Sequence, residues 1–318
     1  MDSLKVMVAK RLGFGLITLI IITALIFLGV EALPGDTATA ILGMGATPET
    51  VAALRKELKL DLPLHVRYFT WLSDFSRGNL GHSLANKRPV AELIGWRFSN
   101  TLFLAASAAV VSVPLALILG MLAALYRDSW FDRLISVSTL GAISFPEFFI
   151  AYSLIAIFSV KLRIFPSVSN ISDQMSFFQK VPLMILPCLT LTFVVLAHMM
   201  RMIRATIIGV LSSPFIEMAA LKGIKPSRII IHHAFPNALS PIINVIILNL
   251  AWLVVGVVVI EVVFAYPGLG QIMVDSVAKR DIPVVQASGL IFACTYVLLN
   301  LTADVLSILT NPRLRSPK

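Results

Sequence analysis

The chain has 318 residues, of which 58% are hydrophobic and 14% are charged. Soluble domains average about 45–50% apolar and about 25% charged residues, so one water-exposed fold cannot account for this composition. The composition excludes a disordered chain, a collagen-like repeat and a disulfide scaffold, and it indicates a membrane protein with several spans. Cys188 and Cys294 lie in apolar runs and are interpreted as core residues without a disulfide or zinc framework.

Six segments are apolar enough to cross about 30 Å of hydrocarbon as helices. They are residues 12–30, 98–126, 134–160, 181–200, 234–260 and 282 to about 307. The first is not expected to be a cleaved signal peptide, because its apolar run is too long and no small-residue cleavage site follows it. An even number of spans places both termini on one side of the membrane.

The net charge of +9 is interpreted as a topology signal and not as nucleic-acid binding. The termini, the turn between the second and third spans and the loop between the fourth and fifth hold thirteen Lys and Arg residues, against five in the short loops of the other face. This asymmetry predicts that both termini are cytoplasmic. The expected division is residues 1–30 (N-terminus and first span), 31–97 (external segment), 98–310 (five-helix core) and 311–318 (cytoplasmic tail).

The outer segment, residues 31–97, is too long for a turn and carries two helical patterns. Thr47-Pro48-Glu49 is a typical helix start, with an N-cap followed by proline. Aromatic and apolar residues from Leu64 to Phe75 then recur at helical spacing. Such a helix suits the headgroup boundary or packs on other helices, so the segment is either a structural cap or a docking surface for an external partner.

The inner loop, residues 201–235, contains a predicted short helix that opens at Ser212-Ser213-Pro214 and ends near Gly223 in the left-handed conformation. Lys225-Pro226-Ser227 predicts a second short helix that runs to Pro236. From the pattern alone, the first helix lies on the lipid surface or inserts into a groove of another protein.

Sequence signatures of catalysis are missing. The chain has no phosphate-binding G-x-x-x-x-G-K-[ST] loop, no H-E-x-x-H and no G-x-S-x-G, so it is not expected to be an enzyme or to hydrolyse ATP by itself. His232 and His233 are adjacent and point to different faces of a helix, so no metal site and no cofactor are expected.

Three acids, Glu147, Glu261 and Asp304, lie in or near apolar spans. Unpaired acids in lipid are costly and are therefore functional candidates. Glu261 can be satisfied by water or by a backbone amide, and Glu147 beside Pro146 can cap a break in the third helix. The alternative is a proton or cation relay in a secondary transporter, for which no membrane-embedded base is evident as a partner.

The inner loop resembles the EAA motif of ABC importer permeases, which reads E-A-A, three residues, G, nine residues, then I-x-L-P. Glu217-Met218-Ala219, Gly223 and Pro236 follow this order, with Met218 in place of the first alanine. The stretch from His233 to Pro241 is similar to the H-x-L-x-N-A-L-x-P of the dipeptide, oligopeptide and nickel branch.

Further motifs resemble the same branch from about residue 10 to Pro312. They are Leu33-Pro34-Gly35-Asp36, Thr47-Pro48-Glu49 with Glu57 to Leu64, Gly78 to Ser83, Glu261 to Phe264, Pro267 to Gly270 and Arg280 to Pro283. Lys59 stands where the branch has glycine. The long outer segment is typical of the first, B-type, of two non-identical permease subunits.

The resemblance implies an all-α permease with six transmembrane helices and a rigid-body change between inward-facing and outward-facing states. It implies four partners: a second, C-type permease subunit, two cytoplasmic ATPases and an external solute-binding protein. The residues expected to contact an ATPase or shape the loop are Phe215, Ile216, Glu217, Ala219, Ala220, Gly223 and Pro236.

The resemblance also limits the cargo. Members of the branch carry dipeptides, longer peptides, nickel complexes, glutathione, opines and some oligosaccharides, and peptides are expected here. A proton-coupled secondary transporter is the alternative from another class, although the two halves show no repeat of broken helices. A membrane-embedded hydrolase lacks a recognisable nucleophile–base pair.

Overall fold

A computed structural model describes residues 2–32, 35–42 and 46–310. The helices are α1 (Asp2–Glu31), α2 (Thr37–Leu42), α3 (Pro48–Glu57), α4 (Leu64–Ser76), α5 (Val90–Leu125), α6 (Trp130–Ser144), α7 (Glu147–Leu154), the π-helix η2 (Ile155–Lys161), α8 (Phe177–Leu211), α9 (Pro214–Leu221), α10 (Pro226–Arg228), the π-helix η3 (Ile229–Ala234), α11 (Phe235–Val263), α12 (Leu269–Ala278) and α13 (Ile282–Thr310). Within these ranges no strand forms beyond one isolated bridge between His82 and Pro89. The all-α prediction is confirmed.

Five uninterrupted helical stretches are long and apolar enough to cross a membrane, namely Val8–Glu31, Val90–Leu125, Phe177–Leu211, Pro226–Val263 and Ile282–Ser307. The bent pair α6 and α7–η2 provides a sixth crossing if it is counted as one span. The helix that contains the second span, α5, begins at Val90, eight residues before the apolar run at 98–126, and Val90 and Ile94 are buried. The first two turns of α5 thus belong to the outer segment as the sequence divides the chain, at residues 31–97.

The third span is a broken helix, as the sequence allows beside Pro146. Its two halves, Trp130–Ser144 and Glu147–Lys161, meet at an angle of 101°. Pro146 lacks a backbone N–H and disfavours helical backbone at the residue before it, and Phe145 is accordingly extended with ψ 134°. Glu147 is the first residue of the second half, so the expected break beside Pro146 is present.

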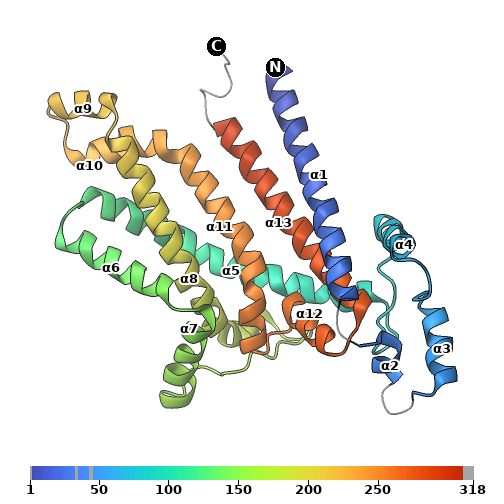
Figure 1. The fold of residues 1–318 in the computed structure, drawn as a ribbon. Helices are drawn as coiled ribbons and strands as arrows, with labels where there is room; N and C mark the ends of the chain where they lie inside the picture. Colours follow the sequence, from blue (N-terminus) through green and yellow to red (C-terminus); the bar gives the residue numbers. More distant parts are fainter. Residues whose placement is uncertain (1, 33–34, 43–45, 311–318) are drawn as a thin grey trace.

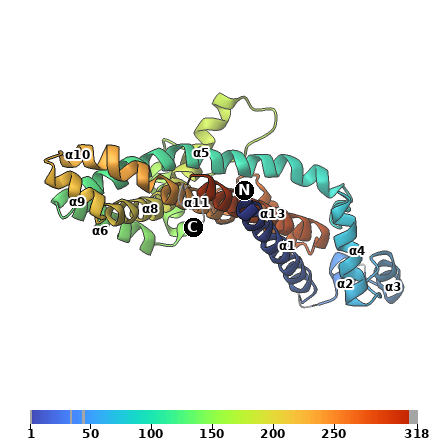
Figure 2. The same cartoon turned by 90° about the horizontal axis from the view of Figure 1, so that it is seen from above.

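The molecule has two distinct ends (Figure 1). The start of α1 and the last turn of α13 lie at the same end as α9, which we call the α9 end; α12 and the helices α2 and α3 lie at the opposite end, the α12 end. Seen from above, the helices of the outer segment stand on the side of the molecule away from α6 and α9 (Figure 2). The bundle thus separates the two segments that the sequence singled out.

Small residues and one buried ion pair hold the central helices together. At Gly120 of α5 an added Cβ would lie 2.9 Å from the Ile203 side chain of α8 and 3.2 Å from the carbonyl of Met200, so only glycine allows this approach. Arg204 of α8 donates two hydrogen bonds of 2.6 Å to the buried carboxylate of Asp132 on α6. These contacts fix α8 against α5 and α6.

The outer segment is built as its patterns predict. Thr47 caps α3 in a capping box with Thr50, and α4 covers Leu64–Ser76. The Tyr68 and Trp71 rings of α4 pack on Phe27 of α1, with ring centroids 5.5 and 6.1 Å away. Of the two placements considered for α4, the structure shows packing on another helix.

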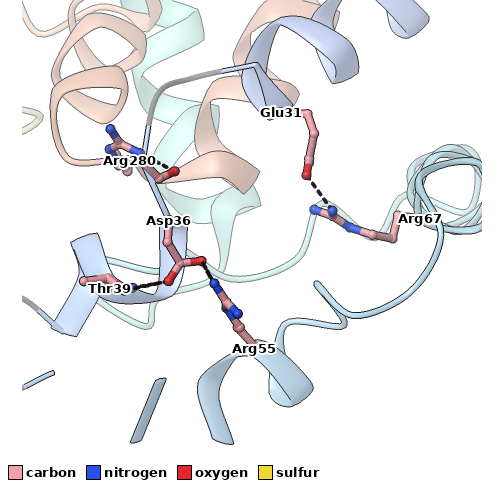
Figure 3. A network of polar contacts seen from close by, with 7 residues as sticks. Glu31, Asp36, Thr39, Arg55, Arg67 and Arg280 are labelled. Carbon is pink, nitrogen blue, oxygen red and sulfur yellow. Dashed lines mark hydrogen bonds and ion pairs between the residues drawn. The ribbon is translucent and has the colours of Figure 1, made fainter. Parts of the chain in front are cut away.

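Three polar contacts order the outer segment and attach it to α1 and to the loop before α13 (Figure 3). Arg67 of α4 contacts Glu31 at 2.7 Å, Arg55 of α3 contacts Asp36 at 3.0 Å, and Arg280 donates to the carbonyl of Gly35 at 3.2 Å. Exposed pairs of this kind contribute about 0–1 kcal/mol each, so they orient the segment more than they stabilise it. The tail at 311–318 lies outside the described residues, as do Leu33 and Pro34 of one motif.

Candidate functional site

The projection at the α9 end is a short helix with defined caps. Ser213 precedes Pro214 as the N-cap of α9, as expected, and Gly223 has φ 75° beyond its C-terminus. The N–H groups of Gly223 and Ile224 donate to the carbonyls of Ala220 and Ala219, which closes the last turn. The turn that glycine permits sets the direction of α9 relative to α11.

The residues predicted to contact an ATPase divide between two faces of α9. Ile216 and Ala219 are 5% and 8% exposed and form a small core with Ile229 and Ala234 of η3. Their side chains therefore face this chain and hold α9 in place, so they are not free for an external contact as the sequence reading assumed. Glu217, Ala220 and Gly223 are exposed, and so is Pro236 in the first turn of α11.

The exposed face of α9 is an apolar stripe that the motif comparison did not identify in full. Phe215, Met218 and Leu221 are 43%, 57% and 77% exposed. They recur every three residues, which places them along one side of the helix. Met218, which stands in place of a motif alanine, and Leu221, which lies outside the motif letters, were not among the predicted contact residues, although their spacing from Phe215 signals them.

The second short helix of the inner loop was predicted to be separate, and this was wrong. α10 continues through η3 into α11 as a single stretch from Pro226 to Val263. Pro236 cannot donate a helical hydrogen bond, and the wider π turn at Ile229–Ala234 accommodates it without ending the helix. The segment that follows α9 is therefore part of the same continuous helix as α11.

Glu261 lies at the α12 end, fully buried, and has a complete set of partners. It accepts hydrogen bonds from the Thr101 hydroxyl at 2.6 Å and from the backbone N–H groups of Gly270 and Gln271 at 2.7 and 3.1 Å. Thr101 in turn accepts from the N–H of Leu269 at 2.8 Å. The first N–H groups of α12 have no partners within their own helix, so Glu261 and Thr101 act together as its cap.

Two glycines make room for this carboxylate. A Cβ at Gly268 would meet the Glu261 carboxylate at 2.0 Å, and one at Gly270 would meet Val258 at 2.7 Å. Asn100 donates to the carbonyl of Pro267 at 2.9 Å, which fixes the same turn to α5. Of the two partners considered for Glu261, the structure shows backbone amides.

Asp304 has a basic partner, contrary to the expectation that none was evident. Arg11 of α1 contacts its carboxylate at 2.8 Å, and both side chains are partly exposed. This pair joins the N-terminal half of α1 to the C-terminal part of α13, and these two helix ends lie at the α9 end (Figure 1). Asp304 and Glu261 therefore lie near opposite ends of the bundle, and each has partners of its own.

Glu147 differs from the other two acids. It is partly buried in the bend between α6 and α7, and none of its contacts with the described residues is a hydrogen bond or an ion pair. The structure thus does not bring the three acids together into one relay. Among the described residues, no group of three His, Cys, Asp or Glu side chains could hold a metal ion.

Comparison with known proteins gives the family. Residues 116–316 match the family described as binding-protein-dependent transport system inner membrane component, and residues 3–105 match the N-terminal part of such membrane components. The glutathione transport system permease protein GsiC of Escherichia coli O6:H1 is 40% identical over 309 residues, which cover 97% of this chain and 98% of that protein. GsiC proteins of Salmonella paratyphi A and of Escherichia coli K12 are each 39% identical over the same shares.

The match spans the helical core, the inner loop and the outer segment, and it agrees with the order of motifs in the sequence. The relatives are permease proteins of transport systems, and the described spans make this chain a multi-pass membrane protein. The chain therefore belongs to the family of inner-membrane permease components of binding-protein-dependent ABC importers.

Proposed function

We propose that this chain forms half of the translocation pathway of an ATP-driven importer of short peptides. The other half is a second, C-type permease subunit; two cytoplasmic ATPases supply energy and an external solute-binding protein delivers cargo. The observation that carries the proposal is the near full-length similarity to permeases of one transport system. The chain's own part is to bind, pass and release cargo, and ATP hydrolysis belongs to the partners.

The α9 end is the cytoplasmic end in this proposal. Exposed basic residues support the assignment, since Lys222, Lys225 and Arg228 follow α9 in the chain and Arg201 lies on α8, the helix that leads into α9. An excess of lysine and arginine is typical of cytoplasmic segments next to spans. Both termini then face the cytoplasm and the outer segment faces the outside.

The helix α9 is the proposed coupling helix. Its stripe of Phe215, Met218 and Leu221, bordered by Glu217 and Ala220, fits an apolar cleft in an ATPase. Ile216 and Ala219 carry the movement inward through their contacts with η3, and the unbroken helix from Pro226 to Val263 carries it across the membrane. Closure of two ATPases would thus reorient α11 as a rigid body.

The outer segment is the proposed contact for the binding protein. A pocket of about 240 Å³ opens between α1, α4 and the start of α13, with Phe27, Trp71 and Pro283 among its lining. In this proposal residues 31–97 form the external unit, residues 98–310 the permease core, and 311–318 the cytoplasmic tail.

Glutathione is the first cargo to test, because the relatives at 39–40% identity are named for its transport. The sequence left glutathione, a tripeptide, as an alternative to the dipeptides and longer peptides that it favoured. Dipeptides and longer peptides are the next candidates, and nickel complexes, opines and oligosaccharides remain alternatives within the same importer class.

The test is uptake of radiolabelled glutathione and of a labelled dipeptide by proteoliposomes that contain the whole transporter, with its binding protein outside and ATP at the ATPases. We expect ATP-dependent accumulation of at least one of the two. Accumulation of neither, with uptake of a nickel complex or an oligosaccharide instead, would contradict the peptide assignment and leave the importer class intact.

A further inference from the structure

A cavity of about 350 Å³ lies where the bent third span meets α8 and α11. The bend provides Phe145, Glu147 and Phe148, α8 provides His198, and α11 provides Trp252 and Val259. In Figure 1 these elements meet below the middle of the bundle, away from both α9 and the outer segment. The volume is at the lower end of the range for small-molecule sites, about 300–1,000 Å³.

The cavity opens on a face that this chain leaves uncovered. Phe145 and Phe148 are 52% and 51% exposed, and Trp252 and Val259 are 38% and 41% exposed. A permease that forms half of a pathway must present such a face to its partner subunit. Covered by that subunit, the cavity would become part of an enclosed passage.

Glu147 is the charged group in this otherwise largely apolar lining. Glu261 has three hydrogen-bond donors and Asp304 has Arg11, whereas Glu147 has no hydrogen bond or ion pair with the described residues. An unpaired carboxylate within a span is costly, and the first turn of α7 compensates only part of the cost. A group that arrives from outside this chain is therefore the natural partner.

The side chains that line the cavity indicate which chemical group of a ligand would bind there. A carboxylate accepts hydrogen bonds and prefers a cation, and the face of an indole ring such as Trp252 also attracts cations. One carboxylate and one imidazole are too few ligands for a typical metal site, and the described residues hold no larger cluster. An ammonium group bound by Glu147 and flanked by Trp252 satisfies both features.

We propose that this cavity is a cargo subsite in which Glu147 binds the free amino group of the translocated peptide. The inference rests on the proposed function, because glutathione, dipeptides and longer peptides all carry such a group. Glu147 would then recognise the cargo while it crosses the membrane. It would not belong to a proton relay of the kind that the three intramembrane acids suggest when only the sequence is known.

The experiment compares Glu147→Gln, Glu147→Asp and wild type in the reconstituted whole transporter. Uptake of labelled glutathione and of a labelled dipeptide is measured together with basal ATP hydrolysis and subunit assembly. The matched control is Glu92→Gln, because Glu92 is an exposed α5 acid whose ion-pair contact with Arg88 is 3.6 Å long.

Loss of one charge-assisted hydrogen bond predicts that Glu147→Gln lowers the maximal uptake rate roughly tenfold to hundredfold. Glu147→Asp should recover a large part of it, and Glu92→Gln should match wild type. Basal ATP hydrolysis and assembly should match wild type in Glu92→Gln, and subunit assembly should persist in both Glu147 variants, so that a loss of uptake reports on passage of the cargo. N-acetylated glutathione, which lacks the cation, should lose less uptake in Glu147→Gln than glutathione does.

Uptake by Glu147→Gln within twofold of wild type would overturn the subsite and leave the proposed function standing. Equal losses for glutathione and its N-acetylated form would also overturn it, since the amino group would then not be the partner. If wild type imports neither glutathione nor the dipeptide while an amine-free solute is transported, the peptide assignment and the subsite both fail.

Discussion

Replacement of Glu261 by alanine tests how the turn at the α12 end is held. The change removes the acceptor for the N–H groups of Gly270 and Gln271, which lie 2.7 and 3.1 Å from the carboxylate in the folded chain. Each buried donor left without a partner costs about 1–3 kcal/mol, so two cost about 2–6 kcal/mol. At roughly 2–4 °C per kcal/mol, the thermal midpoint in detergent should fall by on the order of ten degrees.

Glu261→Gln is the matched control for this prediction. A glutamine oxygen can accept from both backbone N–H groups while its amide donates to Thr101, whose hydroxyl already lies 3.2 Å from the carbonyl of Arg97. The loss should therefore be at most about 1–2 kcal/mol, and the midpoint should stay close to that of wild type. A midpoint for Glu261→Ala within one or two degrees of wild type, or equal damage from both variants, would refute the capping argument.

Three further predictions concern other parts of the chain. Gly223→Glu should abolish uptake, because a residue other than glycine pays about 1–2 kcal/mol in the left-handed backbone conformation of this turn. Insertion and assembly should persist, because open space surrounds the position. Normal uptake would contradict the coupling role. Arg204→Ala leaves the buried Asp132 carboxylate unpaired and should cost about 3–5 kcal/mol, measured as a lowered thermal midpoint, with Arg204→Lys less affected. Hydrogen bonds from Thr39 hold the pKa of Asp36 below its ordinary value of 3.8. The stabilisation is therefore present above pH 3.8 and is lost as the pH falls through the lowered pKa. The thermal midpoints of wild type and Asp36→Asn should differ above pH 3.8 and converge on that acidification.

Local signals in the sequence predict the helix ends well. Thr47 and Ser213 mark the starts of α3 and α9, and Gly223 adopts the left-handed backbone expected after α9. Each of these helix ends depends on a few residues that are neighbours in the chain, so it can be predicted from the sequence alone. The all-α class follows equally directly from the length of the apolar runs.

Prolines show where local signals stop being sufficient. Pro114 lies inside α5 and Pro241 inside α11 without ending either helix, whereas Pro146 accompanies a bend of 101°. The residue type is the same in all three cases, so packing around each proline decides the outcome. The separate helix expected before Pro236 failed for the same reason, because a π turn absorbed the proline.

The roles of the three intramembrane acids depend on contacts far apart in sequence. Glu261 meets Thr101 across 160 residues, and Asp304 meets Arg11 near the opposite terminus. No local pattern reveals such partners, so the sequence alone groups these acids with Glu147. Only the fold shows that Glu147 is the one of the three without a hydrogen bond or ion pair to the described residues.

The inward and outward faces of α9 could have been separated from sequence more fully than they were. The spacing of Phe215, Met218 and Leu221 already indicates one side of a helix. The burial of Ile216 against Ile229 depends on how the chain turns at Gly223, and this required the structure. The motif by itself does not distinguish the residues that pack α9 against η3 from the residues that are exposed on its outer side.

Uptake that depends on ATP and on α9 is the most direct test of the coupling account. The whole transporter is reconstituted with wild-type chain or with Leu221→Glu, which changes a side chain that is 77% exposed. We predict that wild type accumulates labelled glutathione or dipeptide only with ATP at the ATPases, and that Leu221→Glu assembles its spans but neither binds the ATPases firmly nor accumulates cargo. Accumulation without ATP, or full ATP-driven uptake by Leu221→Glu, would contradict the account.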